Sequence, residues 1–584
     1  MAWGTPLTED KPKRMPASLN DACNVKRRML VIGLDGAPFG LVSRMVKEGH
    51  LHNIGRLMEQ GSWGVLRSTI PPFTSPVWRC LCTGKNPGKL GVFGFLRRRK
   101  GSYDWEVENF GEIDSECVWD ILGRHGARIA VIGVPTTFPP AEVNGIMVSG
   151  WPIPKGGVFV FPPDLQESIQ RMGWETDRDW KATWRFDSEE EFLRGLYAAT
   201  ESQFQVVKHM ITASEWDFFM TVFPFTDSVQ HFMWKYMDET HPLHDKVDAG
   251  RFGGEIVRYY RKIDEMIGEL IRIAGESCSV FLVSDHGAGP LRSVFNVNNW
   301  LVDRGYMEIS NKGFGRIIRI AISSERLRSA LRKSRMLQCY YVLSDKLAQT
   351  RLLSRIVPDH ARLWGKALFA GVNWNRSVAY GIGVGNAGYI YVNVKEREPN
   401  GVVNPEDYTG IRERIINDLR DLRWPDTLQK IPVLVFRGEQ IYHGEKVQQA
   451  PDIVFFLGNF TVDVASMIDP TGKVHVLDVS SRHDSGTHTM EGILVAKADG
   501  MIKRNLDLGE ASIFDVTPTI LHLMGCPIPS DLDGRVLEIM IEPSFAKHPV
   551  ITGTPSYAKR HGRRNWSKQE EQEILERLKR LGYL

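Results

Sequence analysis

The sequence predicts an α/β protein in which a mostly parallel central sheet is covered by helices on both faces. Continuous apolar runs at residues 29–34, 218–223 and 279–283 are typical of strands buried on both faces. Helical segments of about ten or more residues lie between such runs, an alternation typical of a parallel sheet. The three runs are followed closely by Asp35, Asp227 and Asp285. Because ligands bind beyond the carboxyl ends of strands in such sheets, these residues indicate a metal site at one sheet edge.

Composition argues against several classes of protein. The net charge of +3, from 73 basic and 70 acidic residues, predicts no general attraction to nucleic acid or to a membrane. Seven scattered cysteines without a CxxC pair predict neither a disulfide framework nor a thiolate zinc site. No apolar stretch approaches the roughly 18 residues of a transmembrane helix. The charged N-terminus lacks the apolar core of a signal peptide, so we expect a cytoplasmic protein.

The pattern along the chain predicts five regions. They are a disordered basic tail at 1–27, a first part of the α/β core at 28–310, a basic helical insertion or cap at 311–365, a second part of the core at 366–543, and a C-terminal extension at 544–584. Residues 312–355 hold eleven Lys or Arg against two acidic residues, and we interpret them as a solvated helical face rather than a surface for acidic partners.

The C-terminal extension predicts an amphipathic helix. Ser567 and Glu570 fit a capping box, and an apolar stripe follows at helical spacing, formed by Ile574, Leu575, Leu578 and Leu581. We expect this helix to pack on the body or on a second subunit, and a homodimer is left open.

Further strand candidates lie at residues 128–134, 145–151, 388–394, 432–436, 452–458 and 492–496. Just before 388–394, the letters GVGNAG (Gly383, Gly385, Gly388) match a dinucleotide-binding fingerprint. That fingerprint requires a strand before it and a helix after it, whereas here a strand follows. We therefore interpret the motif as a chance match.

Thr74 is the candidate nucleophile. It is followed by Ser75 and Pro76 and then by a short apolar helical run, so it should lie at a helix N-terminus. There the free amide groups and the positive dipole end stabilise an anion. A hydroxyl in that position can be activated if a metal lowers its pKa, although the motif alone would more often be a simple helix cap.

Histidines and carboxylates in four places indicate metal binding. Asp227 and His231 are spaced i, i+4, which puts both on one helix face, and Asp285 and His286 are adjacent at a strand end. His488 lies in a glycine-containing loop directly before an apolar strand. His483, five residues earlier, is the alternative ligand, and we favour His488 for its GTH context.

The order of these motifs resembles a known family. LDG at 34–36 is followed by TSPxW at 74–78, TGxxPGxxG at 83–91, TDxxxH at 226–231, SDHG at 284–287 and GTH at 486–488. Together they resemble the type I phosphodiesterase and nucleotide pyrophosphatase branch of the alkaline phosphatase superfamily, from about Met29 to Leu537. The resemblance implies an alkaline-phosphatase-like fold and a hydrolase of phosphate diesters or nucleotide pyrophosphates.

The resemblance also implies two divalent metal ions. One would be held by Asp35, Asp285 and His286 with the Thr74 oxygen, and the other by Asp227, His231 and His488. Zn²⁺ is favoured and Mn²⁺ is the alternative. Thr74 would attack phosphorus, giving a phosphothreonine intermediate that water hydrolyses, with net retention at phosphorus.

Substrate contacts depart from the family pattern. Val77 and Leu90 stand where related sequences have Asn and His, and Arg79 and Lys85 are the substitute candidates for contacting the phosphate ester. The leaving group is open. A phosphomonoesterase of the same superfamily, or a metal-binding regulatory module without turnover, is the alternative function.

Overall fold

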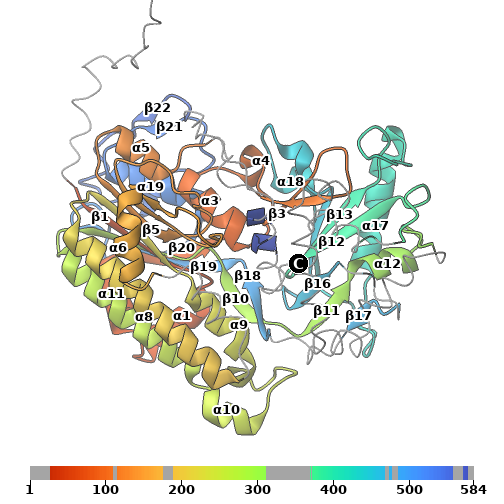
Figure 1. Cartoon of the computed structure of the whole chain (residues 1–584), viewed down its shortest axis with the longest axis horizontal. Helices are drawn as coiled ribbons and strands as arrows, with labels where there is room; N and C mark the ends of the chain where they lie inside the picture. The colour runs from red at the N-terminus through yellow and green to blue at the C-terminus, as the bar shows by residue number, and fades with distance from the viewer. Residues whose placement is uncertain are drawn as a thin grey trace, which may run out of the picture.

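The largest sheet among the described residues organises the fold (Figure 1). The computed structural model describes residues 27–108, 115–174, 188–310, 369, 371–466, 468, 472–476, 484–556, 570–571 and 573–575. Within these residues, the largest sheet has nine strands in the order β20-β2-β19-β9-β1-β8-β5-β6-β7. Their bounds are β1 (Met29–Leu34), β2 (Ser62–Arg67), β5 (Ile129–Val134), β6 (Gly145–Ser149), β7 (Val160–Phe161), β8 (Phe218–Phe223), β9 (Ser279–Val283), β19 (Glu491–Lys497) and β20 (Leu506–Ser512).

The middle of this sheet is parallel. Strands β9, β1, β8, β5 and β6 run in the same direction, whereas β19 and β7 run antiparallel to their neighbours. The prediction of a mostly parallel α/β sheet is therefore confirmed.

Helices cover both faces of the sheet, because successive residues of each central strand point to opposite sides. From β1, Leu30 and Ile32 join one core and Met29 and Val31 join the other. The first core contains α1 (Phe39–Lys47), α2 (His52–Gln60), α8 (Glu189–Ala213), α9 (Phe225–Met237) and α11 (Glu255–Ala274). The second contains α3 (Thr74–Thr83), α5 (Val118–Arg124) and α19 (Val516–Leu523). Every residue of β1 is buried, which explains its uninterrupted apolar sequence.

A second sheet lies on the other side of the molecule (Figure 1). Its path is β12-β13-β15-β16-β11-β17, with β14 paired to β15. The bounds are β11 (Ser293–Asn296), β12 (Ala379–Val384), β13 (Ala387–Val392), β14 (Val433–Arg437), β15 (Ile453–Leu457), β16 (Val462–Ala465) and β17 (His475–Val476), with helices α12 (Val297–Asp303), α17 (Tyr408–Arg420) and α18 (Gly438–Ile441) nearby.

Strands expected to extend the central sheet belong instead to this second sheet. Segments 388–394, 432–436 and 452–458 form most of β13, β14 and β15, which pair antiparallel. A two-residue turn joins β12 to β13, and such a turn permits only antiparallel pairing. The apolar runs predicted strands correctly but did not indicate which sheet they join.

The remaining described elements connect these parts. They are α4 (Pro87–Leu90), β3 (Leu96–Arg98), β4 (Trp105–Val107), η2 (Pro163–Leu165), α6 (Gln166–Arg171), α10 (Lys246–Phe252), β10 (Gly287–Pro290), η3 (Pro405–Asp407), η4 (Val447–Gln449), β18 (Gly486–Thr489), η5 (Ile513–Asp515), β21 (Ile528–Pro529), η6 (Glu538–Met540) and β22 (Thr552–Gly553). The antiparallel pair β10 and β18 lies between the two sheets (Figure 1).

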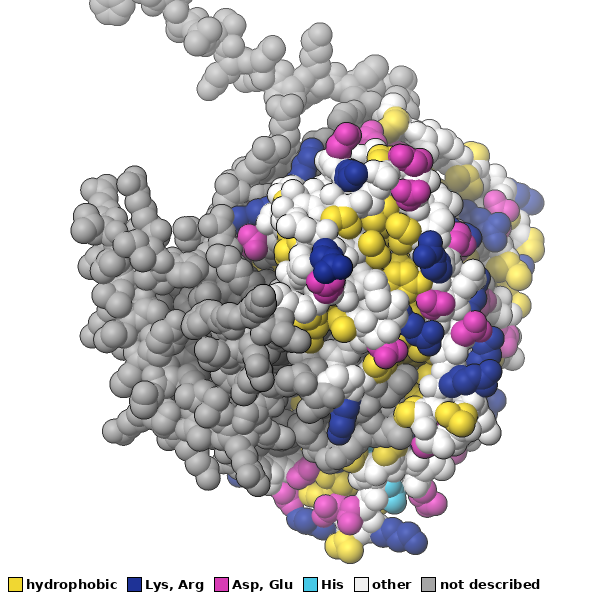
Figure 2. Space-filling view, turned by 90° about the vertical axis from the view of Figure 1, so that its right-hand side faces the viewer, with side chains coloured by type: hydrophobic (Ala, Val, Ile, Leu, Met, Phe, Trp, Pro, Cys, Tyr) yellow, Lys and Arg dark blue, Asp and Glu magenta, His cyan; other side chains and the backbone are white. Residues whose placement is uncertain are grey.

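Figure 2 looks onto the side of the molecule that carries the second sheet. On its described surface, basic and acidic side chains are interspersed around smaller groups of hydrophobic side chains. This mixture agrees with the nearly balanced charge of the whole sequence. No helix among the described residues is long and apolar enough to cross a membrane.

Several sequence predictions lie outside the described residues. They concern the tail at 1–26, the insertion at 311–365, and His483, Ser567, Leu578 and Leu581. In the C-terminal extension, residues 570–571 and 573–575 are helical. Ile574 and Leu575 are buried in the core of the second sheet, so this part of the predicted stripe packs on the body.

Candidate metal and catalytic site

Neighbouring strands end at the first group of candidate ligands. β1 ends directly before Asp35, and β9 ends two residues before Asp285. Because β1 pairs in parallel with β9 and β8, the carboxyl ends of the three strands meet. His286 Nε2 lies 3.3 Å from Asp35 Oδ1 and 3.4 Å from Asp285 Oδ2. The Gly36 N–H donates to Asp285 Oδ1 at 3.1 Å, which fixes the loop after β1 against the end of β9.

Helix α9 supplies the next two candidates. It begins just after β8 and carries Asp227 and His231 one turn apart, with His231 Nε2 3.3 Å from Asp227 Oδ2. The Thr226 hydroxyl donates to the Asp35 carbonyl oxygen at 2.6 Å, and Gln230 Nε2 donates to the next carbonyl at 2.7 Å. These bonds tie α9 to the loop after β1 and bring Asp227 close to Asp35.

His488 reaches the same place from β18. Its ring stacks on His286 with centroids 3.9 Å apart. Its Nε2 lies 3.4 Å from Asp227 Oδ1 and 3.0 Å from His231 Nε2. The structure therefore brings together all six predicted carboxylate and imidazole residues.

The ligand atoms form two overlapping groups that share one carboxylate. One group is Asp227, His231 and His488, and the other is Asp35, Asp227 and His286, with donor atoms within 4.8 Å of one another in each. Asp285 adjoins the second group through His286. The sequence assigned Asp227 to one group only, whereas its position allows it to serve both.

Thr74 lies beside these groups as the first residue of α3, and Phe73 holds the N-cap position. The Thr74 hydroxyl donates to Asp35 Oδ1 at 3.4 Å, while Trp78 Nε1 donates to Asp35 Oδ2 at 3.4 Å. The first backbone bond of the helix runs from the Val77 N–H to the Phe73 carbonyl. The amide groups of the first two helical residues precede that bond, and such groups stabilise an anion.

Burial and crowding set the pKa values of the carboxylates. Burial raises the pKa of Asp35, and burial together with the charge of Asp35 raises the pKa of Asp285 well above its ordinary value. Burial also opposes ionisation of Asp227, but the charge of His231 outweighs it and holds the Asp227 pKa well below its ordinary value. Asp227 is thus the carboxylate held most firmly in its charged form.

The three histidines differ. Burial lowers the pKa of His231, but the charge of Asp227 outweighs it and raises the value to about 9. Asp285 outweighs burial in the same way and raises the pKa of His286 to about 10. Burial, and then the charge of His286, lowers the pKa of His488 to about 3, so its imidazole is neutral.

This donor set fits divalent metal ions. The Nδ1 atoms of His286 and His488 lie 2.9 and 3.1 Å from backbone carbonyl oxygens, the second bond that metal-ligating histidines usually make. In the described part of the chain, Asp227 Oδ1, Asp285 Oδ2 and His286 Nε2 are buried without a hydrogen bond. A cation would satisfy such converging polar atoms, and carboxylate with imidazole is a ligand mixture that zinc accepts.

Some neighbours of the site were not predicted. Thr226 and Gln230 each precede a ligand by one residue in TDSVQH, and Trp78 lies one helical turn after Thr74. Asp484 Oδ1 lies 3.9 Å from His231 Nδ1. Thr226 and Trp78 are fixed letters of the TDxxxH and TSPxW motifs, whereas only closeness to the ligand motifs could have indicated Gln230 and Asp484.

The two candidate substrate contacts do not meet at Thr74. Arg79 donates to the backbone carbonyl of Thr136. Lys85 follows the other end of α3 and donates to Asp531 Oδ2 and Ser556 Oγ, both at 2.6 Å. An α-helix rises about 1.5 Å per residue, so Lys85 lies roughly 15 Å along the axis from Thr74.

A groove of about 680 Å³ is lined by residues that lie close in sequence to candidate ligands. Trp234 lines it and lies one turn after His231 on the same face of α9. Arg44, Ala288 and Phe460 also line it. Its volume lies within the roughly 300–1,000 Å³ typical of small-molecule sites.

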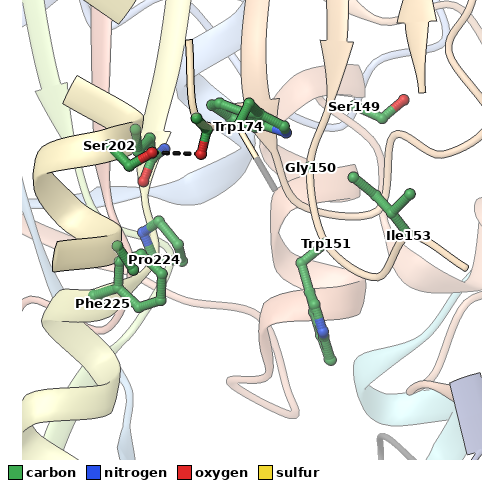
Figure 3. A pocket seen from close by; sticks show the side chains of 12 residues that line it. Ser149, Gly150, Trp151, Ile153, Trp174, Ser202, Pro224 and Phe225 are labelled. Atoms are coloured by element: carbon green, nitrogen blue, oxygen red, sulfur yellow. Dashed lines mark hydrogen bonds between the residues drawn. The ribbon is translucent and has the colours of Figure 1, made fainter. Parts of the chain in front are cut away.

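A smaller cavity lies at the carboxyl ends of β5, β6 and β8, among Trp151, Trp174 and Phe225 (Figure 3). In it the Ser202 hydroxyl donates to the Gly173 carbonyl. The cavity measures about 30 Å³, room for only about two water molecules.

Comparisons with known proteins agree with the motifs. Residues 29–491 match the family model described as type I phosphodiesterase/nucleotide pyrophosphatase, a range that contains every candidate ligand. No curated protein sequence matches significantly. Among solved structures, an inactive variant of murine ectonucleotide pyrophosphatase/phosphodiesterase 5 in complex with AMP aligns at 10% identity, covering 88% of this chain and 100% of that chain, with a TM-score of 0.46. Phosphonoacetate hydrolase from Sinorhizobium meliloti 1021 in complex with phosphonoformate aligns at 14% identity, covering 84% and 94%, with a TM-score of 0.47.

Proposed function

The chain belongs to the type I phosphodiesterase/nucleotide pyrophosphatase family and is a phosphoric ester hydrolase, and we propose that it cleaves phosphate diesters or nucleotide pyrophosphates with Thr74 as its nucleophile. The observation that carries this proposal is the position of Thr74. Its hydroxyl lies at the start of α3 and donates to Asp35, within a cluster of three carboxylates and three imidazoles. A binding module would need no hydroxyl at that point.

Two divalent metal ions complete the proposed site. Asp35, Asp285 and His286, with Thr74, would hold one, and Asp227, His231 and His488 the other. Because Asp227 also lies close to Asp35 and His286, it would serve both ions. When bound, the ions supply Lewis-acid stabilisation of negative charge on the phosphate ester. Zn²⁺ suits this mixture of oxygen and nitrogen ligands, with Mn²⁺ as the alternative.

The proposed reaction has two displacement steps at phosphorus. Thr74 Oγ forms a bond to phosphorus, and the bond from phosphorus to the leaving oxygen breaks on the opposite side. The Thr74 proton is directed at Asp35 Oδ1, which accepts its hydrogen bond. The amide groups at the start of α3 stabilise charge on the phosphoryl oxygens. Water then cleaves the phosphothreonine, and the two inversions give net retention at phosphorus.

The groove beside α9 is the proposed place for the organic part of a small-molecule ester. Trp234 continues the face of α9 that carries Asp227 and His231, and it lines the groove with an aromatic ring. Arg44 also lines the groove and adds a positive charge that suits a second phosphate.

Turnover of two model substrates tests the proposal. Metal-reconstituted wild type should cleave bis(p-nitrophenyl) phosphate in preference to p-nitrophenyl phosphate. Thr74→Ala should lower kcat by at least about 10³-fold, because the covalent step is lost. Thr74→Ser keeps a hydroxyl and is the matched control that should retain measurable turnover. Preference for the monoester would identify a phosphatase, and undiminished turnover by Thr74→Ala would exclude Thr74 as the nucleophile.

A further inference from the structure

The glycine-rich segment GVGNAG forms the hairpin that joins β12 to β13 in the second sheet. A Cβ atom on Gly383 would lie 1.7 Å from the Val464 carbonyl oxygen, and one on Gly388 would lie 2.1 Å from the Phe455 ring. Gly385 has a φ of +49° at the first turn position, where two-residue hairpins of one common type take glycine. These glycines therefore allow close packing and a tight turn.

The tip of this hairpin contacts the candidate catalytic site. A Cβ atom on Gly385 would lie 3.1 Å from a ring carbon of Phe73, the residue directly before Thr74. The Phe73 ring in turn packs edge-on against the His488 ring, with centroids 5.5 Å apart. The second sheet thus reaches residues that the first sheet places around the metal ligands.

Asn386 follows Gly385 at the tip and is fully buried. Its Nδ2 donates to the His488 carbonyl oxygen at 2.6 Å and to the Phe460 carbonyl oxygen at 3.0 Å. Its Oδ1 accepts no hydrogen bond from the described residues. The opposite orientation of the amide would place its oxygen against two carbonyl oxygens, so the donor must face them.

His488 is consequently held from two sides. Its ring Nδ1 lies 3.1 Å from the Pro72 carbonyl oxygen, which directs Nε2 toward Asp227. Its main chain is held by the amide of Asn386. The ring bond sets the orientation of the imidazole, and the main-chain bond sets the position of the residue.

We propose that Asn386 is a positioning residue for the metal ligand His488, through which the second sheet completes a site otherwise built on the first. This inference rests on the proposed function, because it takes His488 as a metal ligand. Partners that position a ligand, rather than bind the metal, typically contribute about 10–100-fold to metal affinity.

Calorimetric titration of the metal-stripped full chain with Zn²⁺ and with Mn²⁺ tests the proposal. Wild type should show two binding steps. In Asn386→Ala one step should weaken by about 10–100-fold while the other is unchanged, because only one ligand group contains His488. Asn386→Ser keeps a hydroxyl donor and should weaken the same step less. If the alanine variant does not fold, the serine variant is the one measured.

Asn298 provides a matched control on α12, a helix that packs against the same sheet. It is also fully buried, and its Nδ2 also donates to two carbonyl oxygens, those of Gly381 and Ser466, at 2.9 and 2.6 Å. Asn298→Ala should lower the Tm much as Asn386→Ala does, yet leave both metal affinities unchanged. Equal weakening of metal binding in the two variants would overturn the proposal.

His488→Ala separates failure of this inference from failure of the proposed function. If that variant loses one binding step and Asn386→Ala does not weaken it, the positioning role is wrong. If His488→Ala binds both metals as wild type does, the ligand assignment of the proposed function is wrong.

Discussion

Asp227 is the carboxylate that the two candidate ligand groups share. Its Oδ1 lies 3.4 Å from His488 Nε2, and its Oδ2 lies 3.3 Å from His231 Nε2. It also belongs to the group with Asp35 and His286. Its strongly lowered pKa keeps it charged across the neutral range.

Asp227→Asn tests this shared role. The substitution keeps the shape of the side chain but removes its charge, so we expect the loss of both metal ions after dialysis. Asp285→Asn is the control, because Asp285 adjoins one group only, and it should cost one ion. Metal content by plasma mass spectrometry distinguishes the two results. Retention of one ion in Asp227→Asn would show that the groups do not share this carboxylate.

Substitution of Trp234 tests whether the substrate binds in the groove that this residue lines. Trp234→Ala removes the aromatic wall but none of the candidate ligands, so KM for an aryl or nucleotide diester should rise by about 10-fold with little change in kcat. Loss of one stacked base typically costs about 1–3 kcal/mol. Steady-state kinetics measure both KM and kcat of the variant and of wild type. An unchanged KM would place the substrate elsewhere.

Among the secondary-structure elements, the β12–β13 hairpin shows how glycines can serve close packing and a tight turn. Gly383 lies against a backbone carbonyl that cannot move without disturbing β16. The nearest atom belongs to the backbone and not to the flexible end of a side chain. The structure therefore cannot easily make room for an added methyl group.

Gly383→Ala should destabilise the protein by about 1–3 kcal/mol or more, because overpacking forces the hairpin away from β16. Urea denaturation measures the effect. Gly410→Ala is the matched control, since Gly410 lies in α17 with nothing within 4 Å of an added Cβ. Alanine should stabilise that helix by up to about 1 kcal/mol. Equal effects at the two positions would contradict the packing argument.

At the scale of the whole molecule, the two sheets are joined by charged contacts as well as by β10 and β18. Asp533 Oδ1 lies 2.6 Å from Lys89 Nζ and 2.8 Å from His443 Nε2. Asp533 lies just before Val536 and Leu537 in the second core of the first sheet, whereas Lys89 and His443 adjoin Leu90 and Tyr442 in the core of the second sheet. Burial raises the pKa of Asp533, but hydrogen bonds from His443 and Lys89 outweigh it and leave the pKa below its ordinary value of 3.8.

A lowered pKa in the folded state gives a definite pH dependence. The stabilisation by the Asp533 carboxylate is fully present above its unfolded pKa and is lost as pH falls through its folded pKa. Asp533→Asn should therefore lower the Tm at pH 7, and the difference from wild type should shrink below about pH 4. Thermal denaturation at several pH values measures this, with the exposed Asp164→Asn as control. A difference that is constant with pH would argue against this contact.

Metal removal should also act on the whole molecule. The buried carboxylates where β1, β8 and β9 end come together only in the folded state. Metal ions bound by them therefore stabilise the folded state by mass action. At a free metal concentration of 100 times Kd the gain is about 2.7 kcal/mol per ion. Chelation should lower the Tm reversibly, and added Zn²⁺ or Mn²⁺ should restore it. An unchanged Tm would argue against metal binding by the cluster.

Local sequence patterns were enough to predict the main helices and strands and the residues of the candidate site. A strand buried on both faces must be apolar throughout, so β1, β8 and β9 were visible as uninterrupted runs, and their ends indicated Asp35, Asp227 and Asp285. The i, i+4 spacing on α9 and the helix start at Thr74 were equally local signals. All of these depend on neighbours a few residues apart.

Which sheet a strand joins and which distant side chains meet became clear from the folded structure alone. β13, β14 and β15 have the apolar composition of central strands, yet antiparallel pairing places them in a second sheet. Asp227 joins both ligand groups, Lys85 pairs with Asp531, and Asn386 holds the main chain of His488 from 102 residues away. Such contacts are set by packing between segments far apart in the chain, and hydrophobic periodicity carries no information about them because it reports only whether a residue is buried.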